Sequence, residues 1–146
     1  MTEDDNIAAE ASCVRLQQRY GTLADRQDPS FRELFAEDAT ITLPEYPPFA
    51  GLEAIMAGQT QWRASGTLMR HICTNFTVDV VDGEHASGIC YLVVFYGGVQ
   101  APEIGEVAPT WPISVGEFHD QFVKLEGKWV FQSRVLRRIF RGAAPS

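Results

Sequence analysis

Apolar residues recur at three- and four-residue steps over the first part of the chain, from residue 7 to about residue 24. A period of 3.6 residues is typical of an amphipathic helix with one buried stripe. The pattern therefore predicts a helix over residues 7–24, and its buried stripe contains Cys13, Leu16, Tyr20 and Leu23.

Two further short helices and a stiff loop are predicted before residue 67. Asp28 and Pro29 have the order of an N-cap followed by a proline at the first helical position, which predicts a short helix through Phe35. A short strand over residues 40–43 follows. Residues 44–51 hold three prolines and two aromatic residues, so we expect a stiff loop that forms one wall of a pocket. A third helix is predicted to begin at residue 51 and to end near Gly66.

The period changes to that of strands after residue 67. Four segments rich in β-branched and aromatic residues predict long strands over residues 68–81, 86–96, 113–125 and 128–140. Asp82-Gly83 and Glu126-Gly127 are predicted hairpin tips. Helices followed by antiparallel hairpins predict an α+β fold with the helices on one face of a curved sheet. The connection over residues 97–112 is long and aromatic, which favours a lid or an interface loop over a plain linker.

Composition limits the classes of function. A chain of 146 residues with 45% hydrophobic and 21% charged residues predicts one globular domain, with flexible tails at residues 1–6 and 141–146. The net charge of -7 argues against nucleic acid as a partner, and the basic cluster near the C-terminus is interpreted as a strand rim with a solvated tail: Arg134, Arg137, Arg138 and Arg141. No apolar run reaches the roughly 18 residues that a membrane span needs, and the N-terminus is acidic. We therefore expect a soluble, cytoplasmic protein without membrane contact.

The cysteines do not indicate a metal site or a disulfide framework. Cys13, Cys73 and Cys90 are odd in number, widely spaced and set in apolar surroundings, which favours reduced core thiols. No Cys or His pair has the spacing of zinc ligands. No metal and no cofactor are predicted.

His71 is the residue that most directly indicates chemistry. An imidazole exchanges a proton near neutral pH without large tuning, and the upstream helix offers Tyr20 and Asp25 as partners. A carboxylate near a helix C-terminus is mildly disfavoured, which hints at a partner for Asp25. If the three side chains share a cavity, the chain is an acid–base enzyme. Pattern alone also fits a core tyrosine, a solvated aspartate at a helix end, and a core or surface histidine.

Several short motifs resemble, in this order, the SnoaL-like branch of the NTF2-like superfamily. They cover roughly residues 7–140 and lie at residues 19–25, 31–39, 49–51, 71–75 and 116–120, and at 127–129 with Arg134 following. The resemblance implies a cystatin-like, cone-shaped sheet, mixed or antiparallel, that three N-terminal helices close around an apolar cavity, commonly in a homodimer. Its relatives include scytalone dehydratase, bile-acid dehydratase, hexachlorocyclohexane dehydrochlorinase, ketosteroid isomerase and polyketide cyclases. Other relatives are non-catalytic, among them small subunits of ring dioxygenases and the nuclear transport factor.

The resemblance also implies roles for individual residues. Asp25 would orient His71, His71 would abstract a proton, and the Tyr20 hydroxyl would stabilise developing negative charge. Asn75 completes the histidine motif, and Arg134 or Arg137 is a candidate supporting group. Further candidates for the cavity wall or for substrate binding are Tyr46, Phe49, Trp62, Tyr91 and Trp111.

Other positions also bear on this assignment. Tyr91 aligns with a position where certain dehydratases have an acidic residue, so a second carboxylate is not supplied there. His85 is expected to be exposed at a hairpin tip, His119 is a minor candidate, and Asp120 is interpreted as structural. The carboxylates of ketosteroid isomerase have no clear match.

Two hypotheses follow. The first is a cofactor-independent lyase or isomerase that acts on an apolar cyclic small molecule, with elimination of water as the favoured reaction. The second is a non-catalytic module that binds a ligand or serves as a dimeric structural subunit. A cavity shared by Tyr20 and His71 favours the first, and a filled space between them favours the second.

Overall fold

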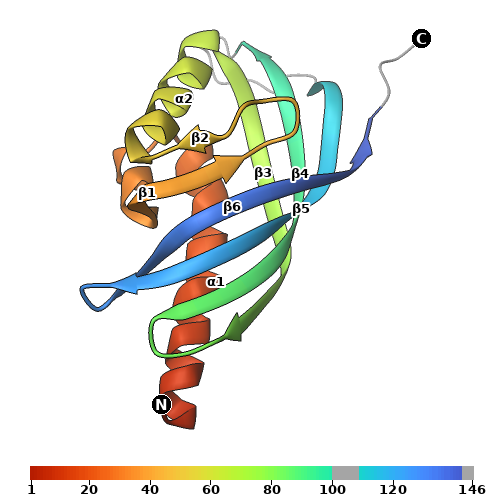
Figure 1. The fold of residues 1–146 in the computed structure, drawn as a ribbon. Coiled ribbons are helices and arrows are strands. Elements are labelled where there is room, and N and C mark those ends of the chain that lie inside the picture. Colours follow the sequence, from red (N-terminus) through yellow and green to blue (C-terminus); the bar gives the residue numbers. More distant parts are fainter. Residues whose placement is uncertain (100–108, 143–146) are drawn as a thin grey trace.

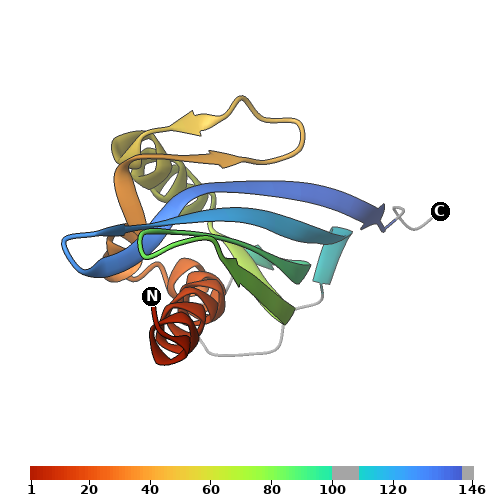
Figure 2. The ribbon, with the colours of Figure 1, turned by 60° about the horizontal axis from the view of Figure 1, so that its bottom comes forward.

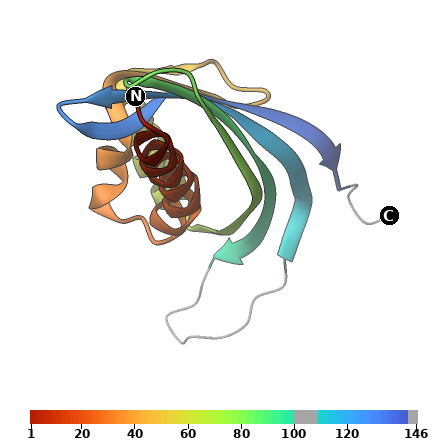
Figure 3. The same cartoon turned by 90° about the horizontal axis from the view of Figure 1, so that it is seen from below.

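A curved, open sheet of six strands wraps around one long helix, as Figures 1 and 3 show. The computed structural model describes residues 1–99 and 109–142. The elements in chain order are α1 (Glu3–Asp25), the 3-10 helix η1 (Pro29–Leu34), β1 (Phe35–Thr42), β2 (Phe49–Ala50), α2 (Leu52–Ser65), β3 (Thr67–Val80), β4 (His85–Val99), β5 (Pro109–Leu125) and β6 (Lys128–Arg141). The α+β prediction is confirmed.

The strand order explains why the sheet is mixed. It runs β2-β1-β6-β5-β4-β3, and every neighbouring pair is antiparallel except β1 and β6, which run parallel. Helix α1 lies inside the curve of the sheet, chiefly against β3, and α2 lies beside β1 and β2 (Figure 2). The concave face and these helices therefore enclose the core.

Helix α1 begins four residues earlier than predicted. Thr2 caps it with a reciprocal capping box, in which Thr2 Oγ1 accepts from the Asp5 N–H and the Asp5 carboxylate accepts from the Thr2 N–H. Residues 3–6 therefore form the first helical turn, where we expected part of a flexible tail. The predicted buried stripe, including Tyr20, is confirmed.

The region between α1 and α2 differs in detail from the prediction. Asp28 caps η1 as predicted, because its carboxylate accepts from the Ser30 N–H, but Phe35 already begins β1. Strand β1 is thus longer than the predicted segment of residues 40–43. The predicted loop of residues 44–51 is interrupted by β2, in which Phe49 pairs with Ile41 of β1.

A bulge in β3 changes which side chains face inward. The pairing of β3 with β4 shifts between Thr74 and Thr77, and Asn75 takes a left-handed backbone conformation with φ of 53°. Before the bulge, His71 and Cys73 face inward; after it, Phe76 and Val78 do. Strict alternation would put Asn75 and Thr77 on the same face as His71 and Cys73. Both are exposed instead, because the extra residue at the bulge reverses the alternation.

The two hairpin tips are as predicted, whereas the predicted long connection is shorter at both ends. The tips at Asp82-Gly83 and Glu126-Gly127 join β3 to β4 and β5 to β6. Strands β4 and β5 extend into both ends of the predicted lid over residues 97–112. The rest of that segment, residues 100–108, lies outside the described residues, as do residues 143–146 of the predicted C-terminal tail.

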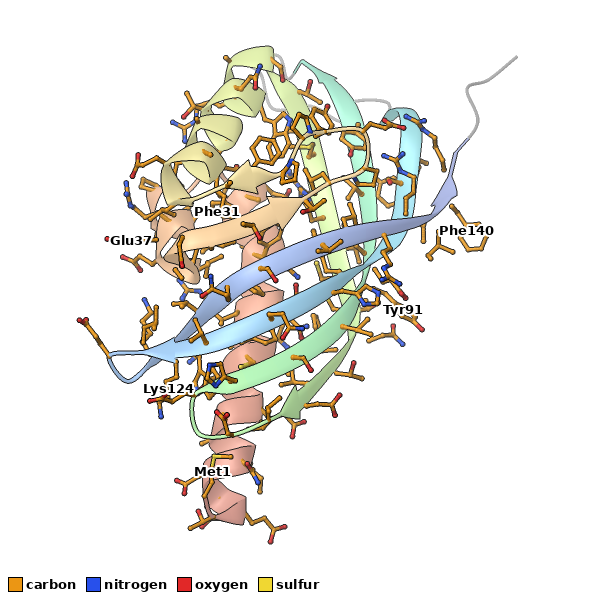
Figure 4. All side chains as sticks on the ribbon, in the orientation of Figure 1. Met1, Phe31, Glu37, Tyr91, Lys124 and Phe140 are labelled. Carbon is orange, nitrogen blue, oxygen red and sulfur yellow. The ribbon has the colours of Figure 1, made fainter. Side chains whose placement is uncertain are left out.

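The convex face of the sheet carries apolar side chains. We call this the outer face, and large exposed apolar side chains on it are Ile72, Tyr91, Phe95, Val135 and Phe140. They alternate along their strands with inward-facing residues such as Cys90, Leu92 and Arg134. Tyr91 and Phe140 project away from α1 in Figure 4.

Candidate active site

The end of α1 meets β3 at a carboxylate–imidazole pair. Asp25, the last residue of α1, accepts a hydrogen bond of 2.9 Å from the His71 backbone N–H through Oδ2. Its Oδ1 lies 2.5 Å from the His71 Nδ1. Strand β3 is an edge of the sheet, so an N–H that points away from β4 needs another acceptor. Asp25 supplies that acceptor, and its two contacts with His71 offset the unfavourable position of a carboxylate at a helix C-terminus.

Gly21 permits this close approach of helix and strand. A Cβ atom at position 21 would lie 2.9 Å from the His71 Cβ and 3.3 Å from the His71 carbonyl oxygen. No ordinary side chain fits in that space. Gly21 therefore sets the distance between α1 and β3 at the level of the histidine.

Tyr20 and His71 line the same cavity. Its volume is about 250 Å³, and its apolar wall comes mainly from Leu43, Met69, Leu92, Val94, Phe118 and Leu136. The Tyr20 ring packs edge-on against the His71 ring, with centroids 6.1 Å apart. Burial raises the pKa of Tyr20 to about 12, so its hydroxyl is a donor at neutral pH. Its hydroxyl makes no hydrogen bond within the described part of the chain and is therefore available to a ligand.

A buried ion pair between Arg134 and Asp120 packs against the Tyr20 ring. Arg134 is fully buried, and its Nε and Nη2 donate to the two carboxylate oxygens of Asp120 at 2.7 and 3.1 Å. Gln17 Nε2 also donates to Asp120, at 3.0 Å. The guanidinium carbon lies 4.3 Å from the Tyr20 ring centroid and 3.8 Å from that of Phe118. Asp120 is thus structural, as interpreted, while Arg134 acts on Tyr20 through packing.

The other end of the cavity carries a second arginine. Arg138 lines the cavity beside Tyr96 and Ser114, and its Nε donates to the Ser114 Oγ at 3.0 Å. Its Nη1 donates to Glu45 Oε1 at 3.1 Å. The cavity therefore has His71 at one wall and a cation at another.

The cluster of arginines predicted as a strand rim is not one surface. Along β6, Arg134 and Arg138 face inward, Arg137 is exposed on the outer face, and Arg141 pairs with Glu45. The alternation of a strand separates them. Arg137 therefore does not support the histidine, and Arg134 lies beneath Tyr20 in the core.

Of the predicted wall residues, Tyr46 and Trp62 line the cavity. Phe49 lies beneath α2 against Trp62, with ring centroids 6.0 Å apart, and does not reach this cavity. Tyr91 is half-exposed on the outer face, because its neighbours Cys90 and Leu92 face inward. The Trp111 side chain lies outside the described part.

Two more candidates lie away from the cavity. Asn75 is exposed at the bulge, where its backbone has the left-handed conformation. His119 sits on the outer face, and its Nε2 lies 2.8 Å from Glu117 Oε1. His85 is exposed beside Asp82, as expected.

The thiols and carboxylates do not gather into a ligand set. Cys13, Cys73 and Cys90 are free, and Cys13 and Cys90 are buried. Within residues 1–99 and 109–142, no three His, Cys, Asp or Glu side chains converge as metal ligands would. None of the described helices is long and apolar enough to cross a membrane.

The sequence analysis missed the arginine end of the cavity. Ser114, Arg138 and Tyr96 occupy inward positions of three neighbouring strands. A signal was present, because Arg134, Leu136 and Arg138 alternate along the predicted strand of residues 128–140. That alternation places Arg138 on the same face as two core residues.

Solved structures share this fold across almost the whole chain. A protein from Novosphingobium aromaticivorans, provisionally described as a scytalone dehydratase, is 19% identical with a TM-score of 0.80, over 99% of this chain and 94% of that one. A hexachlorocyclohexane dehydrochlorinase of type 2 is 14% identical with a TM-score of 0.82, over 99% and 94%. A Mycobacterium tuberculosis protein of unknown function is 23% identical with a TM-score of 0.74, over 92% and 74%.

At these identities the structural likeness shows the fold alone. No curated protein matches the chain significantly. The model of the SnoaL-like domain, however, matches residues 5–135, which include both halves of the histidine pair. The chain therefore belongs to the SnoaL-like domain family, as the order of its motifs indicated.

Proposed function

We propose that this protein is a cofactor-independent acid–base lyase or isomerase, of the dehydratase type, that acts on an apolar cyclic small molecule. The observation that carries the proposal is the Asp25–His71 pair, whose imidazole lines a cavity that Tyr20 also lines. The two solved structures described as a dehydratase and a dehydrochlorinase support the reaction class by analogy.

The geometry gives each residue a role in an elimination. With its Nδ1–H donated to Asp25, His71 has a lone pair on Nε2 and is a general base. It takes a proton from the carbon next to a substrate carbonyl. The Tyr20 hydroxyl donates a hydrogen bond to that carbonyl oxygen as negative charge develops there.

The second half of the reaction returns the proton. The electron pair of the enolate forms the carbon–carbon double bond, and the hydroxyl on the next carbon leaves. His71 Nε2–H protonates this leaving hydroxyl, so the products are an unsaturated ketone and water. One proton is taken and one is given back, which leaves the imidazole ready for the next turnover.

Cavity size and lining support a small, apolar substrate. A cavity of about 150 Å³ is enough to hold benzene. The volume of about 250 Å³ found here suits a molecule with one or two rings. Its walls are mostly aliphatic and aromatic, which favours ring systems over sugars or nucleotides.

Isotope exchange tests the proposal even while the substrate is unidentified. A panel of one- and two-ring β-hydroxy ketones is incubated with the protein in D₂O, and mass spectrometry follows deuterium uptake and loss of water. We expect both for at least one compound, and neither with His71→Gln. His119→Gln is the matched control, because that histidine lies on the outer face. Compounds that bind but exchange no hydrogen would favour the non-catalytic binding module.

We also propose that two copies pair through the outer face. Its exposed apolar side chains come from β3, β4 and β6, and the outward Glu117 of β5 and Arg137 of β6 are cross-strand partners that supply charges of both signs. Sedimentation velocity would show a dimer for the wild type and a monomer for Tyr91→Glu. Gln18→Glu on an exposed face of α1 serves as control and should stay dimeric. A monomeric wild type would contradict this proposal.

A further inference from the structure

The cavity contains a cation that the proposed elimination does not use. Arg138 on β6 lines the cavity, and its side chain is only 22% exposed. The buried Ser114 accepts from its Nε at 3.0 Å and holds the guanidinium in place. Tyr96 lines the same end, and burial raises its pKa, so its hydroxyl stays protonated. The result is an oriented set of donors that faces an otherwise apolar space.

Arg138 already forms an ion pair with a carboxylate of the chain itself. Glu45 Oε1 accepts from Arg138 Nη1 at 3.1 Å, and the same carboxylate accepts from Arg141 at 2.9 and 3.3 Å. Hydrogen bonding to Arg138 lowers the pKa of Glu45, so the pair is charged at neutral pH. Glu45 is 54% exposed, and an exposed ion pair of this kind is weak enough to exchange with a solute anion.

The backbone at Glu45 supports a role for its side chain. Glu45 has φ of 71°, and the Tyr46 N–H donates to the Leu43 carbonyl at 3.3 Å across a tight turn that has Pro44 at its second position. The third position of such a turn favours glycine or asparagine. A glutamate there keeps a strained conformation, and strain of this kind is concentrated at functional sites.

We propose that the substrate is a cyclic compound that carries a carboxylate, which Arg138 binds at the cavity end opposite the histidine pair. This inference rests on the proposed function and narrows its substrate class from apolar rings to ring acids. Glu45 accepts from the same guanidinium to which the ligand carboxylate would bind. On binding, the ligand displaces Glu45 from Arg138, while Arg141 keeps its contact with Glu45. Guanidinium and carboxylate match in a bidentate geometry, so the contact also orients the ring.

The charges around Arg138 agree with this assignment. Tyr96, Tyr46 and Ser114 near the guanidinium are neutral, Arg141 adds a second positive charge, and Glu45 is the nearest anion. The chain as a whole has a net charge of -7. The arginine end of the cavity thus attracts a carboxylate, whereas the negatively charged protein surface in general does not. A ligand carboxylate is therefore drawn to Arg138 and not to other places on the protein.

Matched probes that differ only in charge test the inference. Benzoate with benzamide, and 2-naphthoate with 2-naphthamide, are titrated into the full-length protein by calorimetry or by ligand-observed NMR. We expect at least one acid to bind tenfold or more tightly than its amide. Equal affinity of acid and amide in both pairs, or binding of none of the four probes, would overturn the inference.

Three variants locate the contact. Arg138→Gln should abolish the preference for the acid, and Arg138→Lys should keep part of it. Arg137→Gln is the matched control, because it removes a neighbouring charge on the outer face and should leave the preference intact. Glu45→Gln removes the internal competitor, so the acid should bind several-fold more tightly. A preference that survives in Arg138→Gln, with a circular dichroism spectrum like that of the wild type, would refute the assignment.

The same titration separates this inference from the proposed function. His71→Gln should retain the preference for the acid, since the two groups lie at different walls. If the preference is present but no probe ketone exchanges hydrogen in the wild type, the anion site stands and the catalytic proposal fails. If neutral ketones are turned over without any preference for acids, the catalytic proposal stands and this one fails.

Discussion

The carboxylate of Asp25 accepts two hydrogen bonds from His71, one from the backbone N–H and one from the ring Nδ1. The Asp25 side chain thus satisfies a backbone N–H at the sheet edge and sets the tautomer of the imidazole. The same two hydrogen bonds offset the unfavourable interaction of its carboxylate with the C-terminus of α1. The fold and the candidate chemistry depend on the same contact.

Asp25→Asn should separate these two roles. The amide oxygen of asparagine still accepts from the His71 backbone N–H, but its NH₂ group then faces Nδ1 and stabilises the wrong tautomer. We expect little change in melting temperature and a loss of activity of roughly 10²- to 10⁴-fold. Nitrogen NMR of the His71 ring and kcat/KM measure the two effects. Asp79→Asn, an exposed site on β3, is the control, and an unchanged tautomer in Asp25→Asn would contradict the prediction.

Tyr20→Phe tests the buried hydroxyl. Burial raises the pKa of Tyr20 to about 12 and also raises the pKa of Tyr96, so ultraviolet titration of the wild type should show late-titrating phenols, of which the variant lacks one. Because the folded-state pKa is the higher one, Tyr20 favours the folded state fully below pH 10, and this contribution decreases as pH rises toward 12. A variant with the same late-titrating absorbance as the wild type would show that the Tyr20 hydroxyl is not buried.

Gly21→Ala should disturb the site through packing alone. The new Cβ would meet the His71 Cβ at 2.9 Å, so α1 and β3 must separate. Overpacking of this kind costs about 1–3 kcal/mol of the free energy of unfolding. We also expect a loss of kcat, because the separation moves His71 away from Asp25. Gly83→Ala, where a Cβ meets nothing within 4 Å, should change neither quantity.

The Arg134–Asp120 pair should show strong coupling. Removal of the arginine alone, in Arg134→Met, leaves the buried Asp120 without its partner and should cost about 3–5 kcal/mol of unfolding free energy. The double variant Arg134→Met with Asp120→Leu removes both charges and should be less destabilised than the sum of the two single variants. Urea unfolding of all four proteins gives the coupling energy. Simple additivity would mean that the pair is not a unit.

Acid titration tests the contact between Glu45 and Arg138. Hydrogen bonding to Arg138 lowers the pKa of Glu45, so this contact favours the folded protein above the unfolded-state pKa and is lost as pH decreases through the folded-state pKa. In Arg138→Gln the Glu45 pKa, measured by carbon-detected NMR, should rise toward its ordinary value. Arg137→Gln should leave it unchanged, and a rise there as well would point to general charge effects.

Pattern analysis predicted the elements well because each depends on local chemistry. The stripe with Tyr20, the cap at Asp28 and the hairpin tips all follow from periods and turn residues within a short window. The pairing of Asp25 with His71 joins residues 46 positions apart, and only the order of the motifs indicated it before the fold was known.

The misplaced residues share a physical cause. Tyr91, Asn75 and Arg138 lie on strands, where a side chain's face depends on a phase that one irregularity reverses. The aromatic character of Tyr91 gave no information on its face. Arg138 was assigned to the surface because arginine is rarely buried, although its strand phase pointed inward.

The bulge at Asn75 divides β3 into two segments whose inward side chains have different surroundings. Before the bulge, Thr67, Met69 and His71 line the cavity, whereas after it Phe76, Val78 and Val80 pack against the core. Because the reversal of phase occurs between the two groups, a substitution at Met69 can reshape the cavity without changing the side chains that fill the core. A single strand thus gives the protein one portion that shapes the cavity and one portion that packs the core.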